Sequence, residues 1–190
     1  MRQRVGPEFF ARLYAADDDP WGFETSPYER AKYDATIAAL PPGPIGSAFE
    51  AGCSIGVLTE RLATRCDRLL AFDVSDAAIE RARARLANAV HVTIERRELP
   101  EEMPAGPYDL IVASEVLYYL DPPAFDAMLD AIEKALVPSG SLVAVHWRHP
   151  TRRYPLRGDE VHERLAARFG RAAHAAWTED YALDRFDSLS

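Results

Sequence analysis

The chain has 190 residues, of which 48% are hydrophobic and 27% are charged, as expected for one globular domain. Its formal net charge of −8 argues against a nucleic-acid partner, because binding to phosphates depends on clustered Lys and Arg. The sequence has no run of about 18 apolar residues and no apolar secretory signal, and its two cysteines lack metal-ligand spacing. We therefore expect a reduced, cytoplasmic protein without a membrane partner or a metal site.

The first 42 residues predict two helices. A short helix covers residues 7–14 and ends before an acidic stretch. A second begins after Ser26, where Ser26 and Glu29 have capping-box spacing and Pro27 occupies the first helical position. It ends at the Pro-Pro-Gly of residues 41–43. We expect residues 1–42 to form a helical cap on the remainder of the chain.

Strands and helices then alternate. Asp121 and Ser75 are the expected N-caps of two of the helices, and Pro138, Ser139 and Gly140 predict a turn. Helices are predicted at 57–65, 76–87, 122–136 and 158–169, and strands at 47–52, 69–74, 90–95, 108–114, 141–147, 172–178 and 181–187.

This order predicts an α/β fold in which parallel strands are joined by right-handed helical crossovers. The last two strands are separated by a connection too short for a crossover, so they must form an antiparallel hairpin. The expected architecture is a Rossmann-like, mostly parallel seven-stranded sheet with that hairpin at its end. Residues 43–190 would be its core, and residues 1–190 would form a single domain.

Ligands bind such sheets at the carboxyl ends of the strands, next to the switch point beside the first strand. There Gly52 and Gly56 lie in the turn into a helix, whose free backbone N–H groups can bind an anion. Glu50 ends a buried strand, where an acidic side chain needs a partner. Asp73 ends the next strand, and a carboxylate at this position accepts hydrogen bonds from ribose hydroxyls. Together these residues predict a nucleoside-type cofactor.

The segments EAGCSIG, FDVS and YDLIVASEVLYYL resemble class I S-adenosylmethionine-dependent methyltransferases. DPWGFETSPYERAKYDATIAAL and HWRHPTRRYPLRGDEVHERL extend the likeness over nearly the whole chain and resemble the nodulation protein S family. That family N-methylates an amino sugar of chitooligosaccharide signals. The resemblance implies S-adenosylmethionine as cofactor and a small-molecule acceptor, and it leaves the identity of the acceptor and the oligomeric state open.

The resemblance also implies the cofactor site. Glu98 and Leu99 would contact adenine, and Ser114 would lie beside the methionine moiety. Ser54 departs from the class pattern, which has a middle glycine there; a serine fits if its backbone angles are ordinary. The remaining expected cofactor residues are Glu50, Ala51, Gly52, Gly56, Asp73 and Val74.

Methyl transfer to an amine requires the amine to be neutral, so a proton acceptor near the strand ends is expected. His146 and Glu115 are the two candidates for catalytic residues. For His146 the alternative is a structural role against a helix, and Glu115 can instead bind the ammonium of the acceptor. His91 and His162 are expected at the surface.

The expected acceptor-binding residues are Trp21, Tyr28, Tyr118, Tyr119 and Arg148. Trp21 and Tyr28 would form a lid, or pack as an ordinary helix on the sheet edge. At least one of Tyr118 and Tyr119 is expected to pack in the core, and the other can face a cationic amine. Arg148 belongs to an arginine-rich stretch that either clamps the acceptor or is a solvated loop.

The sequence is compatible with three other functions. The acceptor can be another metabolite with a nitrogen or oxygen nucleophile. A nicotinamide-dependent oxidoreductase fits less well, because Gly52-x-x-x-Gly56 is not the Gly-x-Gly-x-x-Gly of dinucleotide sites. A non-catalytic, cofactor-binding partner protein is the third possibility.

Overall fold

A computed structural model describes residues 3–188 of the chain. Its centre is a seven-stranded sheet with the order β3-β2-β1-β4-β5-β7-β6. The strands from β3 to β5 are parallel, while β7 pairs antiparallel with both β5 and β6, so the predicted Rossmann-like architecture is confirmed. The strands are β1 (Ile45–Ala51), β2 (Cys66–Asp73), β3 (Val92–Arg96), β4 (Tyr108–Ser114), β5 (Leu136–Trp147), β6 (His174–Trp177) and β7 (Tyr181–Asp187).

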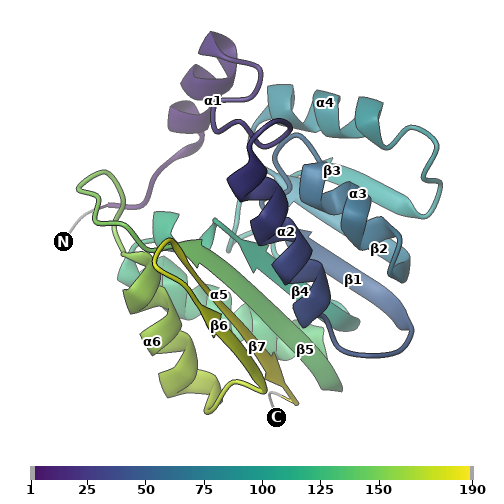
Figure 1. Ribbon diagram of the computed structural model, residues 1–190, viewed down its shortest axis with the longest axis vertical. Coiled ribbons are helices and arrows are strands. Elements are labelled where there is room, and N and C mark those ends of the chain that lie inside the picture. The colour runs from purple at the N-terminus through teal and green to yellow at the C-terminus, as the bar shows by residue number, and fades with distance from the viewer. Residues whose placement is uncertain (1–2, 189–190) are drawn as a thin grey trace.

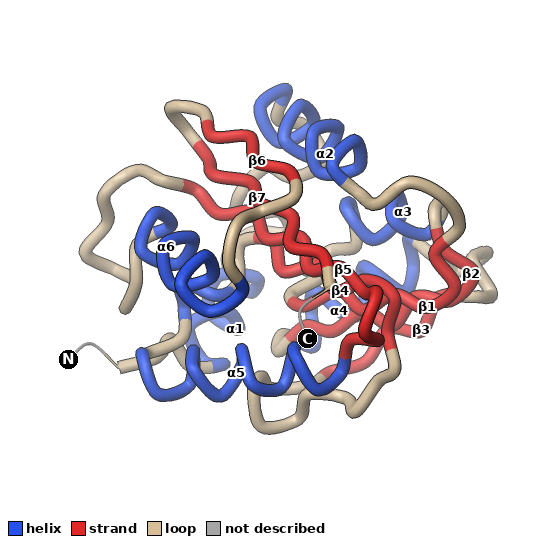
Figure 2. The backbone as a smooth tube through the Cα atoms, turned by 90° about the horizontal axis from the view of Figure 1, so that it is seen from below, coloured by secondary structure: helices blue, strands red, loops and turns tan. Residues whose placement is uncertain are grey.

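Helices cover both faces of the sheet. Figure 2 shows α2 and α3 on one face, and α5 and α6 on the other. This arrangement explains why β4, which has helices on both sides, is apolar along most of its length. The helices are α1 (Pro7–Ala16), α2 (Pro27–Ala39), α3 (Val57–Ala63), α4 (Asp76–Arg85), α5 (Pro122–Ala135) and α6 (Gly158–Phe169), with a 3-10 turn, η1 (Leu117–Tyr119).

The predicted helix starts are confirmed at three caps. The side chains of Ser26, Ser75 and Asp121 each accept a hydrogen bond from the backbone N–H three residues later. The capping box at Ser26 is only half formed, because the carboxylate of Glu29 accepts from Lys32 instead of returning to the cap.

The predicted turn at 138–140 is wrong. These residues lie within β5, where Tyr108 of β4 pairs with Leu136 but Leu110 pairs with Ser141. At this register shift β5 forms a bulge, which accommodates residues 138–140 without ending the strand.

Of the two N-terminal helices, α1 lies at the carboxyl ends of the parallel strands, while α2 packs on a face of the sheet against α3, β5 and β7. In Figure 1, α1 stands above the sheet at the end where β1 and β4 terminate. Backbone and side chains hold this segment in place: Val5 N donates to Tyr119 O at 2.9 Å, and Arg81 of α4 is paired with Asp18. None of the helices within residues 3–188 combines the length and apolar character that crossing a membrane requires.

Candidate active site

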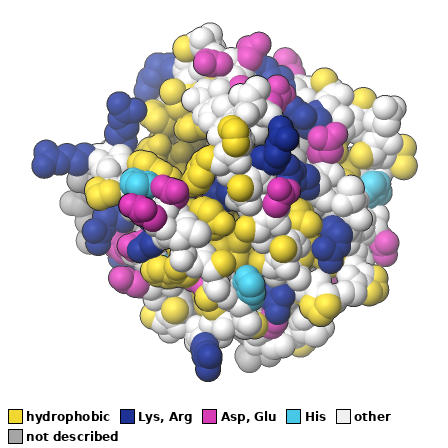
Figure 3. Space-filling model, in the orientation of Figure 1, with side chains coloured by type: hydrophobic (Ala, Val, Ile, Leu, Met, Phe, Trp, Pro, Cys, Tyr) yellow, Lys and Arg dark blue, Asp and Glu magenta, His cyan; other side chains and the backbone are white. Residues whose placement is uncertain are grey.

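A cavity of about 320 Å³ opens at the carboxyl ends of the strands. Figure 3 shows a hollow lined by hydrophobic side chains between α1 and the loop that follows β5. Its volume is within the range of small-molecule sites, and its position is the switch point where β1 lies between β2 and β4. Of the predicted cofactor and acceptor residues, the following line it: Glu50, Gly52, Ser54, Asp73, Val74, Glu98, Leu99, Ser114, Glu115, Trp21, Tyr28, Tyr118 and Tyr119.

The turn after β1 needs three left-handed residues. Gly52, Ser54 and Gly56 have φ angles of +75°, +52° and +82°. Ser54 therefore does not meet the condition of ordinary backbone angles; it adopts a left-handed conformation that favours glycine, at a cost of about 1 kcal/mol. Its hydroxyl is hydrogen-bonded to that of Tyr14 in α1, which ties this turn to the N-terminal cap.

Asp73 is held by the turn that it faces. Its Oδ2 accepts from Ser54 N and its Oδ1 from Ser75 N, both at 2.9 Å. Each carboxylate oxygen keeps a lone pair for a further donor. Burial raises the pKa of Asp73, and the backbone N–H donors act in the opposite direction. The carboxylate is thus pre-oriented at the cavity wall before any ligand hydroxyl reaches it.

Glu50 has an acceptor atom without a partner. The residue is 1% exposed, and its Oε2 makes no hydrogen bond within the described structure. Burial raises its pKa to about 7. A buried carboxylate at a cavity wall is costly when it is alone, so this site is suited to a ligand that brings a positive charge.

We expect Glu50→Gln to stabilise the ligand-free protein at pH 8. Because the pKa of Glu50 is higher in the folded protein than its ordinary value of 4.5, the folded state binds more protons between these values and loses stability as the pH rises. Full ionisation of the Glu50 carboxylate costs up to about 3 kcal/mol of stability. The net gain of the variant is this amount minus the cost of burying the glutamine amide. Thermal melts at pH 5 and pH 8 check this: the gain should be small at pH 5, near the lower end of this range, and much larger at pH 8, and an equal gain at both values would contradict it.

At the end of β4 the chain places an ion-pair cluster. Glu115 has φ of +57°, and its Oε1 accepts from Lys32 Nζ at 2.6 Å. Its Oε2 accepts from Tyr118 Oη at 2.6 Å and from Trp147 N at 3.0 Å. Lys32 also donates to Glu29 Oε1 at 3.0 Å. The carboxylate of Glu115 is therefore fixed at the cavity wall with one lone pair of Oε1 still available.

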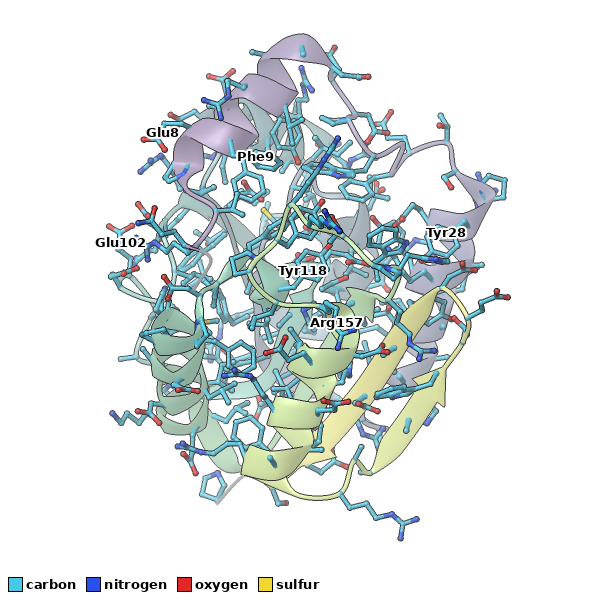
Figure 4. All side chains as sticks on the ribbon, turned by 90° about the vertical axis from the view of Figure 1, so that its left-hand side faces the viewer. Glu8, Phe9, Tyr28, Glu102, Tyr118 and Arg157 are labelled. Carbon is cyan, nitrogen blue, oxygen red and sulfur yellow. The ribbon has the colours of Figure 1, made fainter. Side chains whose placement is uncertain are left out.

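Aromatic side chains enclose this end of the cavity. Tyr118 stacks on Tyr154 at 4.9 Å between ring centroids, and Tyr119 meets the same ring edge-on at 4.6 Å. Figure 4 shows Tyr118 beneath the loop after β5 and Tyr28 on α2. Both Tyr118 and Tyr119 are largely buried yet line the cavity, so each takes part in packing and in the site.

The other end of the cavity is closed by the N-terminal segment. Arg4 pairs with Glu98 at 2.7 Å and with Glu101 at 2.6 Å. Glu98 and Leu99 follow β3, where the ring of a nucleoside bound by Asp73 would extend. The adenine assignment of these two residues remains a prediction.

The structure corrects the catalytic assignment of His146. This residue is 0% exposed and is absent from the cavity wall. Its Nε2 accepts from Leu117 N at 3.2 Å, its Nδ1 lies 3.1 Å from Nε2 of His162, and His162 Nδ1 lies 2.7 Å from Asp184. Burial lowers the pKa of His146 well below 6.5. His146 thus supports the turn that carries Tyr118, and His162, which is 1% exposed, is not the surface residue that was expected.

The structure places three further predicted site residues outside the cavity wall. Arg148 pairs with Asp159 at 2.6 Å and lies over the ring of Trp177, outside the cavity. Gly56 packs against α4, where a Cβ atom would lie 3.1 Å from Ala82. Ala51 is fully buried behind the wall. Neither Gly56 nor Ala51 lines the cavity.

Sequence reasoning missed Lys32, Glu29 and Arg4. One signal was present for the first: Lys32 and Lys134 are the only lysines among 22 basic residues. Lysine differs from arginine in its compact ammonium, so its rarity here draws attention to both positions, of which Lys134 is exposed and Lys32 is buried. Its partner Glu115 is 83 positions away, so the pair itself was not readable from the sequence.

Comparison with known proteins agrees with this geometry. The profile of the nodulation protein S (NodS) family matches residues 8–151. The chain is 38% identical over 130 residues to nodulation protein S of Rhizobium tropici, covering 67% of this chain and 55% of that protein. Against three such relatives it spans 55, 60 and 62% of their lengths.

Solved structures show the same architecture. N-methyltransferase NodS of Bradyrhizobium japonicum WM9, in complex with S-adenosyl-L-homocysteine, is 29% identical with a TM-score of 0.86 and covers 98% of this chain and 100% of its own. A putative methyltransferase of Pseudomonas syringae is 40% identical with a TM-score of 0.75, covering 84% of this chain and 98% of its own.

The sheet order, the glycine turn and the carboxylates at the strand ends define a Rossmann-like fold of the methyltransferase class. Within that class, the chain belongs to the nodulation protein S family.

Proposed function

We propose that the protein is an S-adenosylmethionine-dependent methyltransferase that acts on the amine nitrogen of a small molecule, an amino sugar or a related oligosaccharide. The observation that carries the proposal is the pair of carboxylates on one cavity wall, Glu50 with an unpartnered oxygen and Asp73 oriented by Ser54 and Ser75. Glu50 suits the ammonium of a methionine moiety, and Asp73 suits ribose hydroxyls.

The residues present fit this cofactor. Gly52 takes a left-handed conformation, and a Cβ there would lie 3.2 Å from the side chain of Val116, so the turn favours glycine. When bound, S-adenosylmethionine supplies a methyl group already activated by a sulfonium. The protein then has to bind both reactants, align them and exclude water. Trp21, stacked on Phe23, and Tyr28 belong to the segment that covers the cavity.

Glu115 is the group that would receive the acceptor. An amine that donates a hydrogen bond to the free lone pair of Oε1 is held at the carboxyl end of β4, beside Ser114. The faces of Tyr118 and Tyr154 bound the same region. Glu115 can also take a proton from the nitrogen before or after transfer.

Two measurements test the proposal in order. Calorimetry with S-adenosylhomocysteine should show binding to the folded protein, and a lack of binding would overturn the cofactor assignment. Mass spectrometry of reactions with a partly N-deacetylated chitooligosaccharide should show added methyl groups. The fully N-acetylated oligosaccharide is the matched control and should stay unmodified. Cofactor binding with methylation of hydroxyl groups only would overturn the amine acceptor.

A further inference from the structure

A buried lysine lies between two carboxylates at the acceptor end of the cavity. Lys32 is 2% exposed, and its Nζ contacts Glu115 Oε1 at 2.6 Å and Glu29 Oε1 at 3.0 Å. Burial opposes its charge, yet Glu115 and Glu29 raise the pKa of Lys32 above its ordinary value. The lysine is therefore charged, and the trio carries a net charge of −1 when all three groups are ionised.

The other titratable groups around Lys32, Glu115 and Glu29 are neutral or paired, so these three residues are the main charges near an amine bound at Glu115. Burial raises the pKa of Tyr28 to about 12 and keeps Tyr33 and Tyr118 protonated, while burial keeps His146 neutral. The negative charge of Glu50 would be balanced by the ammonium of the proposed cofactor. Asp180 lies in the turn between β6 and β7, outside the cavity wall.

Charge at this position decides the protonation state of the acceptor. An amine bound to Glu115 Oε1 would lie about 4.5 Å from Lys32 Nζ, since both would donate to one oxygen. A carboxylate alone favours the ammonium form, which has no lone pair and cannot attack. An adjacent positive charge favours the neutral amine.

We propose that Lys32 is a positioning residue that keeps the bound acceptor amine in its neutral, nucleophilic form by balancing the charge of Glu115. This inference rests on the proposed amine methylation. The ammonium releases its proton to Glu115 or to water, and the freed lone pair then forms the N–C bond while the electron pair of the broken C–S bond stays on sulfur. The methylated nitrogen loses its remaining excess proton afterwards.

The pH dependence of kcat with saturating substrates tests the proposal, because its ascending limb reports ionisation in the complex. In Lys32→Met the limb should move to higher pH by about one to two units, for a charge at this distance in a partly wet site. Burial raises the pKa of Glu29, while its pairing with Lys32 favours the carboxylate. Above that pKa, Glu29→Gln removes a negative charge and should move the limb to lower pH. The double variant has the wild-type net charge and should return the limb close to its original position.

The double variant also gives a test that does not depend on Lys32→Met folding. Compared with Glu29→Gln, it removes the lysine from a background without the second carboxylate, so it remains informative if Lys32→Met does not fold. Asp34, on the same helix as Lys32, is exposed and pairs with Arg61 of α3. Asp34→Asn is therefore the matched charge control and should leave the limb unmoved.

If the ascending limb does not move in either single variant, or if it moves in the same direction in both, the proposed role of Lys32 is wrong. If the wild type binds S-adenosylhomocysteine but methylates no amine, the proposed function fails instead. The two failures are thus distinguishable. Restored pH dependence in the double variant is an outcome that a purely structural lysine would not produce.

Discussion

Asp73→Ala is expected to raise the dissociation constant of S-adenosylhomocysteine about 1000-fold. The substitution removes a carboxylate that is already oriented by two backbone N–H groups and faces the cavity. Two charge-assisted hydrogen bonds to ribose hydroxyls contribute about 1.5–3 kcal/mol each, which accounts for a loss of this size. Calorimetry on the folded variant measures it.

The matched control for this variant is Asp109→Ala. Asp109 also accepts a backbone hydrogen bond, from Ser47 N at 2.8 Å, but it lies at the start of β4 and outside the cavity wall. Its loss should lower the melting temperature without changing the dissociation constant. If both variants weaken binding equally, Asp73 acts through stability and not through contact with the ligand.

Glu115→Gln should lower kcat for an amine acceptor about 1000-fold and leave the dissociation constant of S-adenosylhomocysteine within about threefold of the wild type. The amide keeps the size of the side chain but cannot take a proton, and general-base groups contribute about 10² to 10⁴. The amide has one acceptor oxygen in place of two, so it can keep either Tyr118 Oη and Trp147 N, which share Oε2, or Lys32 Nζ, which donates to Oε1. Steady-state kinetics and calorimetry measure the two effects separately.

Glu133→Gln, at an ion pair between α5 and Arg168, is the control for removing a paired carboxylate away from the cavity. Its kcat should match the wild type. A variant at Glu115 with full activity would exclude this residue as the group that binds the amine or takes its proton.

Most of the framework was predictable because its determinants are local. The caps Ser75 and Asp121 are set by side chains that reach backbone groups three residues away. The antiparallel end of the sheet followed from the short connection between β6 and β7. The bulge in β5 was missed because it depends on the register with β4, which no local pattern contains.

The cofactor half of the candidate site was predictable for a related reason. Glu50 and Asp73 end adjacent parallel strands, and the topology brings the carboxyl ends of such strands together. The acceptor half was not. His146 was predicted as a base from its ordinary pKa, but burial and its contact with His162 make it a neutral structural group.

Fold class and the carboxylates and glycine turn of the proposed donor site were predictable from the sequence, because periodicity, caps and turn residues act over short distances. The family was predictable from the resemblance of whole segments. Which charges meet at the proposed acceptor end of the cavity depends on the tertiary structure. Lys32 and Glu115 are 83 positions apart, and His162 and Asp184 are 22 apart. Burial and pairing of these groups depend on how the helices pack on the sheet, and that packing sets their protonation.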